Sequence, residues 1–335
     1  MKAITLSKLG GPEQLSLVDV PAPEPEPGQV RVRLRASALN RRDVWITLGQ
    51  YPGIRLPCVM GSDGAGTVDQ LGSEVSPDLL GQEVVIYPAF DWGDDTRFPS
   101  ATFRVLGMPD PGTFAEYICV PAGHVFPKPA FLSWEQAAAI PLAGLTAWRA
   151  LMTQAAAQPG ETVLVTGIGG GVATFALKWA AALGARTFVT SGNPAKLERA
   201  RQLGAAGGID YRAEGWAKRL VELTGGVDAI VDGTGGASFN AYFLALKPAG
   251  RLVVYGSTAG NPPAGFDLVR LFFRQARIIG STMGSPAEFG AMLRFVAEHR
   301  IEPVIDRVFG LDEAVAAHQR LLAAEQLGKI VLRHD

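Results

Sequence analysis

TVLVTGIGGGVATFALKWAAAL, residues 162–183, is the stretch that decides the fold. Four glycines fall within five positions, between a β-branched apolar segment and an apolar segment with helical spacing. Glycine permits left-handed backbone and close approach of the chain to a phosphate, and a helix N-terminus presents unpaired N–H groups to it. The stretch therefore predicts a strand, a glycine turn and a helix that bind the pyrophosphate of a dinucleotide.

The glycines match the G-x-G-x-x-G pattern in two registers. In one, Val172 occupies the third glycine position, and in the register shifted by one Ala173 occupies it. Both registers place the phosphate at the same turn, whose candidate residues are Gly167, Gly169, Gly170, Gly171 and Val172. The alternative is a turn that only lets strand and helix pack closely, because the pattern alone is weak evidence.

Strands and helices alternate on both sides of this stretch. RTFVTS at 186–191 reads as a strand and residues 194–203 as a helix. Further strands with turns are predicted at 227–236, 250–260 and 276–285. Alternation of this kind predicts a parallel sheet with helices on both faces.

The first part of the chain has a different pattern. In QVRVRLRA, residues 29–36, apolar residues alternate strictly with arginines, which predicts a half-buried strand. Many short strands with Gly and Pro turns over residues 1–125 favour a sandwich or barrel. Residues 303–333, close to the end of the chain, read as a strand, a helix and a strand. They could complete the first domain, which would then be discontinuous in sequence.

Composition limits the possible partners. The 335 residues carry 31 basic and 32 acidic side chains, so no basic excess favours nucleic acid. No apolar run reaches the ~18 residues of a membrane span. Only two cysteines, Cys58 and Cys119, are present, which fits a reducing compartment. We expect a cytoplasmic protein with a small-molecule substrate and no nucleic-acid or membrane partner.

The end of the second strand indicates which dinucleotide binds. NAD sites usually place Asp or Glu there for the ribose 2′-OH, but FVTSGNPAKLERAR, residues 188–201, has no acid at positions 190–192. Donors surround the place instead: Ser191, Asn193, Lys196 and Arg199. A 2′-phosphate favours such donors, so we expect NADP(H). The alternative is that the basic residues form only a solvated helix face.

Nine segments, in order, carry a resemblance to a known family. They are ASALNRRDVWITLGQYPG, LPCVMGSDGAGTV, GTFAEY, AAAIPLAGLTAWRAL, VTGIGGGVA, VDGTGG, VVYGSTAG, IIGSTMGS and GKIVLR. The chain resembles the medium-chain dehydrogenase/reductase superfamily, within it the zinc-free quinone oxidoreductase-like branch. The resemblance implies an α/β fold: a GroES-like β-rich domain built from residues 1–125 and 300–335, and a Rossmann doubly wound parallel sheet over 126–299.

The resemblance also implies site residues. Asn40, Asp43 and Tyr51 match positions beside the nicotinamide, with Tyr51 as proton donor, although Asp43 could cap a helix and Tyr51 could pack in its loop. By position in the family, further cofactor contacts are Thr146, Tyr211, Gly233, Thr234, Gly256, Ser257, Thr258 and Lys329. The glycines among them could equally form ordinary strand–helix turns.

No metal site is expected. The positions that match the catalytic zinc ligands of alcohol dehydrogenases are Asn40, Ser62 and Leu142, and none is a good zinc ligand. The segment that matches the structural-zinc loop, residues 89–112, contains no cysteine.

The absence of zinc ligands suggests which class of substrate accepts a hydride from the cofactor. Without zinc to polarise an alcohol oxygen, quinones and conjugated carbonyls (enones and enals) become the favoured substrates. Two enzymatic alternatives are reduction of enoyl thioesters and an alcohol dehydrogenase-like activity, and a non-enzymatic one is an NADPH-binding structural or regulatory protein. The apolar segment 276–285, near the expected sheet edge, favours a homodimer or homotetramer, as is common in the family.

Overall fold

The computed structural model describes residues 1–265 and 267–334. The chain divides into two compact units, Met1–Leu145 with Gly284–Asp335, and Thr146–Met283. The first unit is discontinuous, and it extends beyond the residues 1–125 and 300–335 that the sequence led us to expect for the β-rich domain. The reason is packing: helix α2 (Trp134–Ala138) lies against the first unit's sheet, and Phe289 of α9 (Pro286–Glu298) packs on Tyr87 and Phe126.

The second unit contains one six-stranded sheet in which every pairing is parallel. Its strands are β11 (Thr162–Val165), β12 (Arg186–Thr190), β13 (Gly207–Ile209), β14 (Val227–Asp232), β15 (Leu246–Val254) and β16 (Arg277–Gly280). They lie in the order β13-β12-β11-β14-β15-β16. Numbered within the sheet this is 3-2-1-4-5-6, the order of doubly wound dinucleotide-binding sheets. The predicted fold class is confirmed.

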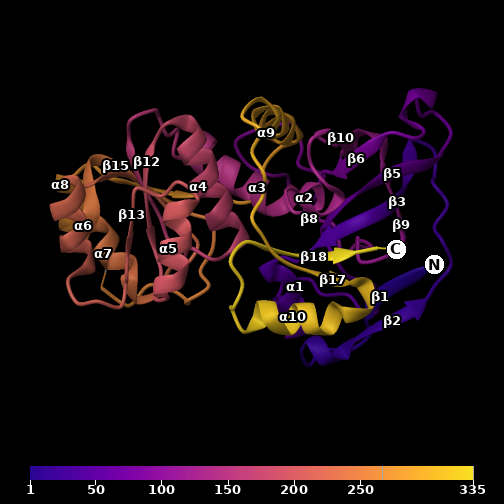
Figure 1. Cartoon of the computed structure of the whole chain (residues 1–335), viewed down its shortest axis with the longest axis horizontal. Coiled ribbons are helices and arrows are strands. Elements are labelled where there is room, and N and C mark those ends of the chain that lie inside the picture. Colours follow the sequence, from indigo (N-terminus) through magenta and orange to yellow (C-terminus); the bar gives the residue numbers. More distant parts are fainter. Residues whose placement is uncertain (266, 335) are drawn as a thin grey trace. The chain divides into compact units, whose positions relative to one another are not determined.

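Helices cover both faces of this sheet. They are α4 (Gly171–Leu183), α5 (Pro194–Gln202), α6 (Trp216–Thr224), α7 (Phe239–Ala245) and α8 (Leu268–Phe273). Figure 1 shows α4 and α5 on one face and α6, α7 and α8 on the other. Helix α3 (Pro141–Trp148) continues into a wider-turned segment, Arg149–Gln154, at the start of the unit.

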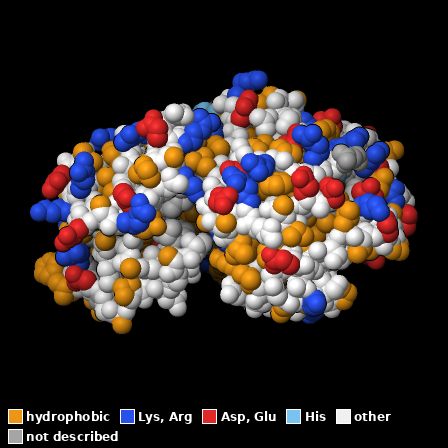
Figure 2. All heavy atoms as spheres, turned by 60° about the horizontal axis from the view of Figure 1, so that its bottom comes forward, with side chains coloured by type: hydrophobic (Ala, Val, Ile, Leu, Met, Phe, Trp, Pro, Cys, Tyr) orange, Lys and Arg blue, Asp and Glu red, His pale blue; other side chains and the backbone are white. Residues whose placement is uncertain are grey.

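The second unit leaves apolar side chains exposed on α8 and on the edge strand β16. They are Leu268, Val269, Phe272, Phe273 and Ile278, and Phe273 is 76% exposed. Hydrophobic side chains gather at the left edge of Figure 2, on the side where Figure 1 places α8. In the described part of the chain, strand β16 pairs with β15 and ends the sheet.

The first unit is built around a seven-stranded sheet with the path β10-β6-β5-β3-β18-β17 and β9 paired to β3. The bounds are β3 (Gln29–Ala38), β5 (Asp63–Leu71), β6 (Glu83–Ile86), β9 (Tyr117–Pro121), β10 (Val125–Pro127), β17 (Ile305–Gly310) and β18 (Lys329–Arg333). Smaller sheets contain β1 (Lys2–Leu6), β2 (Leu15–Asp19) and β4 (Cys58–Val59), and β7 (Ala89–Phe90) with β8 (Arg104–Val105). The remaining helices are α1 (Arg41–Thr47) and α10 (Ala314–Leu322).

Strand β3 pairs with β18, the last strand of the chain. Its alternating residues Val30, Val32 and Leu34 are almost fully buried, as the periodicity predicted. Its last residues pair antiparallel with β18, Val331 opposite Ala38. The C-terminal strand is thus part of the first unit's main sheet.

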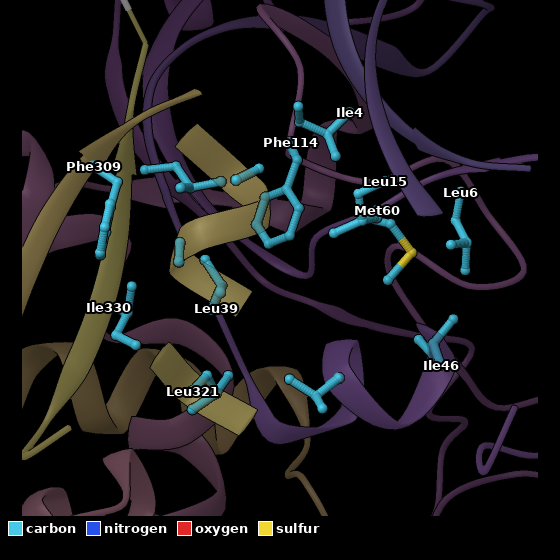
Figure 3. Packing of buried hydrophobic residues seen from close by; sticks show 14 of the residues in the cluster. Ile4, Leu6, Leu15, Leu39, Ile46, Met60, Phe114, Phe309, Leu321 and Ile330 are labelled. Carbon is cyan, nitrogen blue, oxygen red and sulfur yellow. The ribbon is translucent and has the colours of Figure 1, made fainter. Parts of the chain in front are cut away.

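One apolar cluster of the first unit draws on both chain ends. Figure 3 shows Ile4 and Leu6 near the N-terminus converging with Phe309, Leu321 and Ile330 from the C-terminal segment. The Phe114 ring lies between them and meets His318 of α10 edge-on, with the two ring centres 5.7 Å apart.

Among the described residues, no helix is both long and apolar enough to cross a bilayer.

Two buried histidines of this unit make its stability sensitive to acid. Burial, the largest effect, lowers the pKa of both His318 and His334 to about 4. The unfolded chain titrates near pH 6.5, so it binds more protons than the folded chain between pH 6.5 and 4. The contribution of these two histidines to the free energy of unfolding is therefore fully present above pH 6.5, and it is lost as the pH falls from 6.5 towards 4.

We expect replacement of His318 to reduce this acid sensitivity. In His318→Gln the fall in unfolding free energy between pH 7 and pH 5 is smaller than in wild type by about 2 kcal/mol, because one neutral buried imidazole is gone. Urea unfolding at the two pH values measures the difference. His299→Gln, at an exposed histidine, is the control, and an unchanged pH dependence in His318→Gln contradicts the prediction.

Candidate functional site

The glycine turn follows β11 and is tied to the neighbouring strand β12. Gly167 has φ 64°, and its N–H donates to the Thr190 hydroxyl at 3.1 Å. The N–H of Ile168 donates to the Thr190 carbonyl at 2.8 Å. A Cβ on Gly167 would lie 2.7 Å from the Thr234 methyl, so both backbone angle and space require glycine here.

Helix α4 begins at this turn with its N–H groups open. Gly170 is the N-cap, and within the described chain no side chain caps the helix. A Cβ on Gly170 would meet no heavy atom of the described residues within 4 Å. Gly169 (φ 136°) precedes the cap, while Gly171 and Val172 form the first turn. Free donors, a positive helix end and open space fit the pyrophosphate of a dinucleotide.

Asp232, a residue that the sequence analysis did not select, joins the turns after two strands. Its carboxylate is fully buried and accepts hydrogen bonds from the hydroxyls of Thr166 (2.6 Å), Thr234 (2.7 Å) and Tyr242 (3.1 Å). Its other oxygen accepts the Gly235 N–H at 3.1 Å. Burial, followed by the charge of Asp232, raises the pKa of Tyr242, so this hydroxyl remains a donor. The feature of the sequence that could have pointed to Asp232 is an acidic residue at the end of an apolar strand.

The turn after β15 approaches the same place. Thr258 donates its N–H to the Gly233 carbonyl at 3.1 Å and its hydroxyl to the same oxygen at 3.2 Å. A Cβ on Gly256 would lie 3.3 Å from that oxygen. Ser257 and Thr258 are exposed. The structure therefore brings the predicted residues of three turns together at the carboxyl edge of the sheet, where open α/β sheets bind ligands.

The predicted 2′-phosphate residues lie at the end of β12. The Ser191 hydroxyl accepts the Asn193 N–H at 3.1 Å, and the Asn193 side chain caps α5 through the Ala195 N–H at 2.9 Å. Lys196 is half-buried on α5, and Tyr211 is 43% exposed. Both bonds occupy acceptor oxygens, so the Ser191 O–H and the Asn193 side-chain NH₂ remain donors that a phosphate can accept from.

Arg212 is a second residue that the sequence analysis missed. A Cβ on Gly192 would lie 2.7 Å from its Nε, so the guanidinium lies directly over the end of β12. It forms an ion pair with Asp210 at 3.0 Å, and this hydrogen bonding lowers the pKa of Asp210. The sequence signal was a basic residue next to Tyr211.

In the first unit, Asn40 and Lys329 meet at Asp63. The Lys329 ammonium donates to the Asn40 side-chain oxygen at 2.7 Å and to Asp63 at 2.8 Å. The Asn40 amide donates to the same Asp63 oxygen at 2.9 Å. Lys329 and Asp63 are almost completely buried. Lys329 was predicted to bind cofactor, and the structure gives it this interior partner set within the first unit.

Asp43 lies at the start of α1 and is fully buried. It accepts the Asn40 N–H at 2.7 Å, which is the contact of a helix cap. Burial raises the pKa of Asp43 to about 6, with the neighbouring Arg42 acting in the opposite direction. In the first unit it is thus a helix-capping residue, the alternative named in the sequence analysis.

Tyr51 lies in the turn that follows α1, with the Arg42 guanidinium 4.7 Å from its ring centre. The ring is half-buried against the apolar cluster of Figure 3. Among residues 1–265 and 267–334, none hydrogen-bonds its hydroxyl. Thr146, the remaining predicted cofactor contact, lies in the second unit with its hydroxyl 3.8 Å from the Met283 sulfur.

The three positions matched to zinc ligands do not fit a metal. Ser62 accepts a hydrogen bond from Arg42 at 2.5 Å, and Asn40 accepts one from Lys329. Leu142 donates its backbone N–H to Asp63 at 2.7 Å, and its side chain has no ligating atom. The described part of the chain holds no group of three metal-ligating side chains. In the segment matched to the structural-zinc loop, Arg104 forms ion pairs with Asp91 and Asp110.

One unit with a doubly wound sheet and glycine turns at its carboxyl edge, and a second, β-rich unit made from both chain ends, define the class of two-domain dinucleotide-dependent oxidoreductases. Residues 26–130 match the model of the alcohol dehydrogenase GroES-like domain, and residues 171–298 match that of the zinc-binding dehydrogenases. The chain belongs to the medium-chain dehydrogenase/reductase superfamily, and it is an oxidoreductase of that superfamily.

Individual relatives agree over nearly the whole chain. A zinc-type alcohol dehydrogenase-like protein YogA of Leptosphaeria maculans is 38% identical, covering 96% of this chain and 94% of its own. A quinone oxidoreductase of Pseudomonas aeruginosa is 34% identical over 99% of both chains. A solved NAD-dependent alcohol dehydrogenase is 39% identical, with TM-score 0.95 over all of both chains.

One solved relative contains a cofactor. It is a crotonyl-CoA carboxylase/reductase in complex with NADP, 26% identical, with TM-score 0.90 over 99% of this chain and 94% of that one. These relatives use different cofactors and substrates, so the finer function depends on this chain's own residues.

Proposed function

We propose that the protein is an NADPH-dependent, zinc-independent reductase that transfers hydride to a quinone or another conjugated carbonyl compound. The observation that carries the proposal is the donor set at the three positions matched to zinc ligands. Ser62 and Asn40 are engaged by Arg42 and Lys329, and Leu142 has no ligating side chain.

This donor set favours acceptors that need no Lewis acid. Quinones and alkenes conjugated to a carbonyl delocalise the added electron pair onto oxygen. A bound nicotinamide cofactor would supply the hydride, that is, two electrons and one hydrogen nucleus. The protein then has to deliver a proton to the anion that forms, and hydrogen-bond donors are sufficient for this.

Tyr51 is the proposed proton donor. Its hydroxyl has no hydrogen-bond partner among the described residues, so the O–H remains available to a substrate oxygen. The proton moves from this hydroxyl to the enolate or hydroquinone anion, and water returns a proton to the phenolate. Asn40 would orient the substrate, with its own amide fixed by Asp63 and Lys329.

The turns of the second unit would hold the cofactor. The open N-terminus of α4 binds the pyrophosphate, and Lys196, Tyr211 and Arg212 surround the 2′-phosphate. Arg212 lies over Gly192 and neutralises Asp210, the acid beside it. A dianionic phosphate is favoured where such cations gather.

Reduction of enoyl thioesters is the second candidate, supported by the likeness to crotonyl-CoA carboxylase/reductase. It involves the same hydride and proton transfers to a conjugated carbonyl. An alcohol dehydrogenase-like activity and a cofactor-binding protein without turnover are the remaining alternatives.

Two copies of the chain are proposed to associate through β16. Among the described residues no strand pairs with its outer edge, which can therefore pair with the same strand of a second copy. The exposed apolar face of α8 lies in the same unit and would gain from burial. The free cysteines Cys58 and Cys119 support a cytoplasmic location.

We expect NADPH to bind at least about tenfold more tightly than NADH, since a charge-assisted hydrogen bond to the 2′-phosphate contributes on the order of 1.5 kcal/mol. Arg212→Gln weakens NADPH binding by about tenfold and leaves NADH binding within twofold. Titration of the cofactor against protein fluorescence measures both constants. The control is Arg201→Gln, at an arginine of α5 paired with Glu198. Tighter NADH binding by wild type contradicts the prediction.

Protein stripped with a strong chelator is expected to keep its full rate of NADPH oxidation. The panel comprises a benzoquinone, an enal, an enoyl thioester and, in reverse with NADP, a primary alcohol. The highest kcat/KM is expected for the quinone or the enal. One bound zinc per chain, or a loss of rate restored only by zinc, refutes metal independence. If no acceptor oxidises NADPH, the protein is a binding protein rather than an enzyme.

Tyr51→Phe is expected to lower kcat by about 10²-fold, the usual contribution of a positioned general acid. NADPH affinity stays within twofold, because the substitution removes only a hydroxyl. Steady-state kinetics on the best acceptor give kcat. Tyr117→Phe is the matched control, since Tyr117 is also half-buried and also stacked with an arginine, Arg31. An unchanged kcat in Tyr51→Phe removes this residue from the mechanism.

A further inference from the structure

Arg42 is a buried cation in the first unit that no step above uses. Its side chain is only 7% exposed, and it lies at the second position of α1, a helix in which five of the seven residues are buried. The guanidinium donates to the Ser62 hydroxyl, to the Leu106 carbonyl at 2.8 Å and to the Met108 carbonyl at 3.4 Å. The central carbon of the guanidinium lies over the ring of Tyr51, 4.7 Å from the ring centre.

The surroundings only partly compensate this charge. The nearest carboxylate is Asp43, 4.0 Å away, and the Arg42 Nε has no partner among the described residues. Burying a charge costs several kcal/mol unless it is paired and hydrogen-bonded, and an apolar side chain of similar volume would avoid that cost. The residue therefore needs an explanation other than the stability of the core.

We propose that Arg42 is a positioning residue for Tyr51: it fixes the plane of the ring so that the unpartnered hydroxyl is held ready for the substrate. The inference rests on the proposed function, because it takes Tyr51 as the proton donor. It adds which residue places that donor, and how.

The platform that holds Arg42 is rigid. Its acceptors belong to the turn before β5 and to the loop after β8, and these two segments pack backbone to backbone. A Cβ on Gly107 would lie 2.3 Å from the Gly61 carbonyl oxygen, so even one added carbon would force them apart. A guanidinium held by three acceptors on such segments presents a fixed planar face, which a lysine ammonium cannot do.

The charge of Arg42 also suits the proposed proton transfer. When the Tyr51 hydroxyl gives its proton to the substrate anion, the ring system gains a negative charge. A guanidinium stacked on an aromatic ring attracts its π electrons, and the attraction grows when the ring becomes anionic. Arg42 would therefore favour the state formed as the proton leaves, without contacting substrate itself.

A double-mutant cycle tests the inference with Arg42→Gln, Tyr51→Phe and the double variant, all measured on the best acceptor. We expect Arg42→Gln to lower kcat by about 10- to 30-fold while KM and the NADPH dissociation constant stay within twofold. In the Tyr51→Phe background the same substitution is expected to change kcat by less than twofold, because no hydroxyl remains to be positioned. Arg42→Lys is expected to restore less than one third of the lost kcat.

The outcomes separate this inference from the function on which it rests. If Tyr51→Phe keeps full turnover, the proposed donor is wrong and the inference fails with it. If Tyr51→Phe lowers kcat but Arg42→Gln does not, only the inference is overturned. The same holds if the fall in kcat of the double variant equals the product of the falls in the two single variants.

Two further variants guard against a simple folding effect. Arg31→Gln breaks an arginine–tyrosine stack of the same kind, with Tyr117, elsewhere in the unit, and is expected to leave kcat unchanged. If Arg42→Gln does not fold, Ser62→Ala removes one acceptor but keeps the cation. A several-fold fall in kcat that disappears in the Tyr51→Phe background supports the inference, and an unchanged kcat contradicts it.

Discussion

The buried contact of Lys329 with Asp63 and Asn40 is the interaction on which the first unit depends. It joins the last strand, the central strand β5 and the start of α1, segments separated by 266 residues or more where Lys329 takes part. Removing one member of a buried ion pair leaves the other uncompensated, at a cost of about 3–5 kcal/mol. This contact also fixes the Asn40 amide, so the same charges that close the fold arrange the candidate site.

The second unit has a corresponding constraint in Asp232. Among the described residues its hydrogen-bond donors are uncharged: hydroxyl and amide groups of the turns after β11 and β14, and the Tyr242 hydroxyl of α7. Because those turns are the proposed cofactor site, their spacing is set by a buried acceptor rather than by side chains that point to the ligand. Both units thus use a buried carboxylate at a strand terminus, the first residue of β5 (Asp63) and the last of β14 (Asp232), to hold together segments that are distant in sequence.

Much of the fold could be predicted from the sequence, because it rests on patterns of short range. Each of these patterns can be recognised within about twenty residues. They are the alternation in β3, the glycine turn after β11 and the succession of strands and helices. The domain boundaries were not legible in the same way. They depend on which unit α2 and α9 pack against, and the ring contacts of Phe289 with Tyr87 and Phe126 connect residues far apart in the chain.

The same difference separates the site residues that were selected from those that were missed. Gly167 and Lys196 belong to motifs, whereas Arg212 and Asp232 matter only because of the group opposite each of them. A sequence identifies Arg42 as basic but gives no sign that it is buried against Tyr51.

The arrangement of Arg42 and Lys329 also bears on chemistry. A catalytic zinc ion can exchange a ligand and bind a substrate oxygen directly. Two organic cations whose donors are already directed to Ser62, Asn40 and Asp63 hold neighbouring groups in place instead. Fixed cations of this kind suit a reaction in which the substrate itself accommodates the negative charge, and this is the physical reason that conjugated carbonyl compounds are the proposed acceptors.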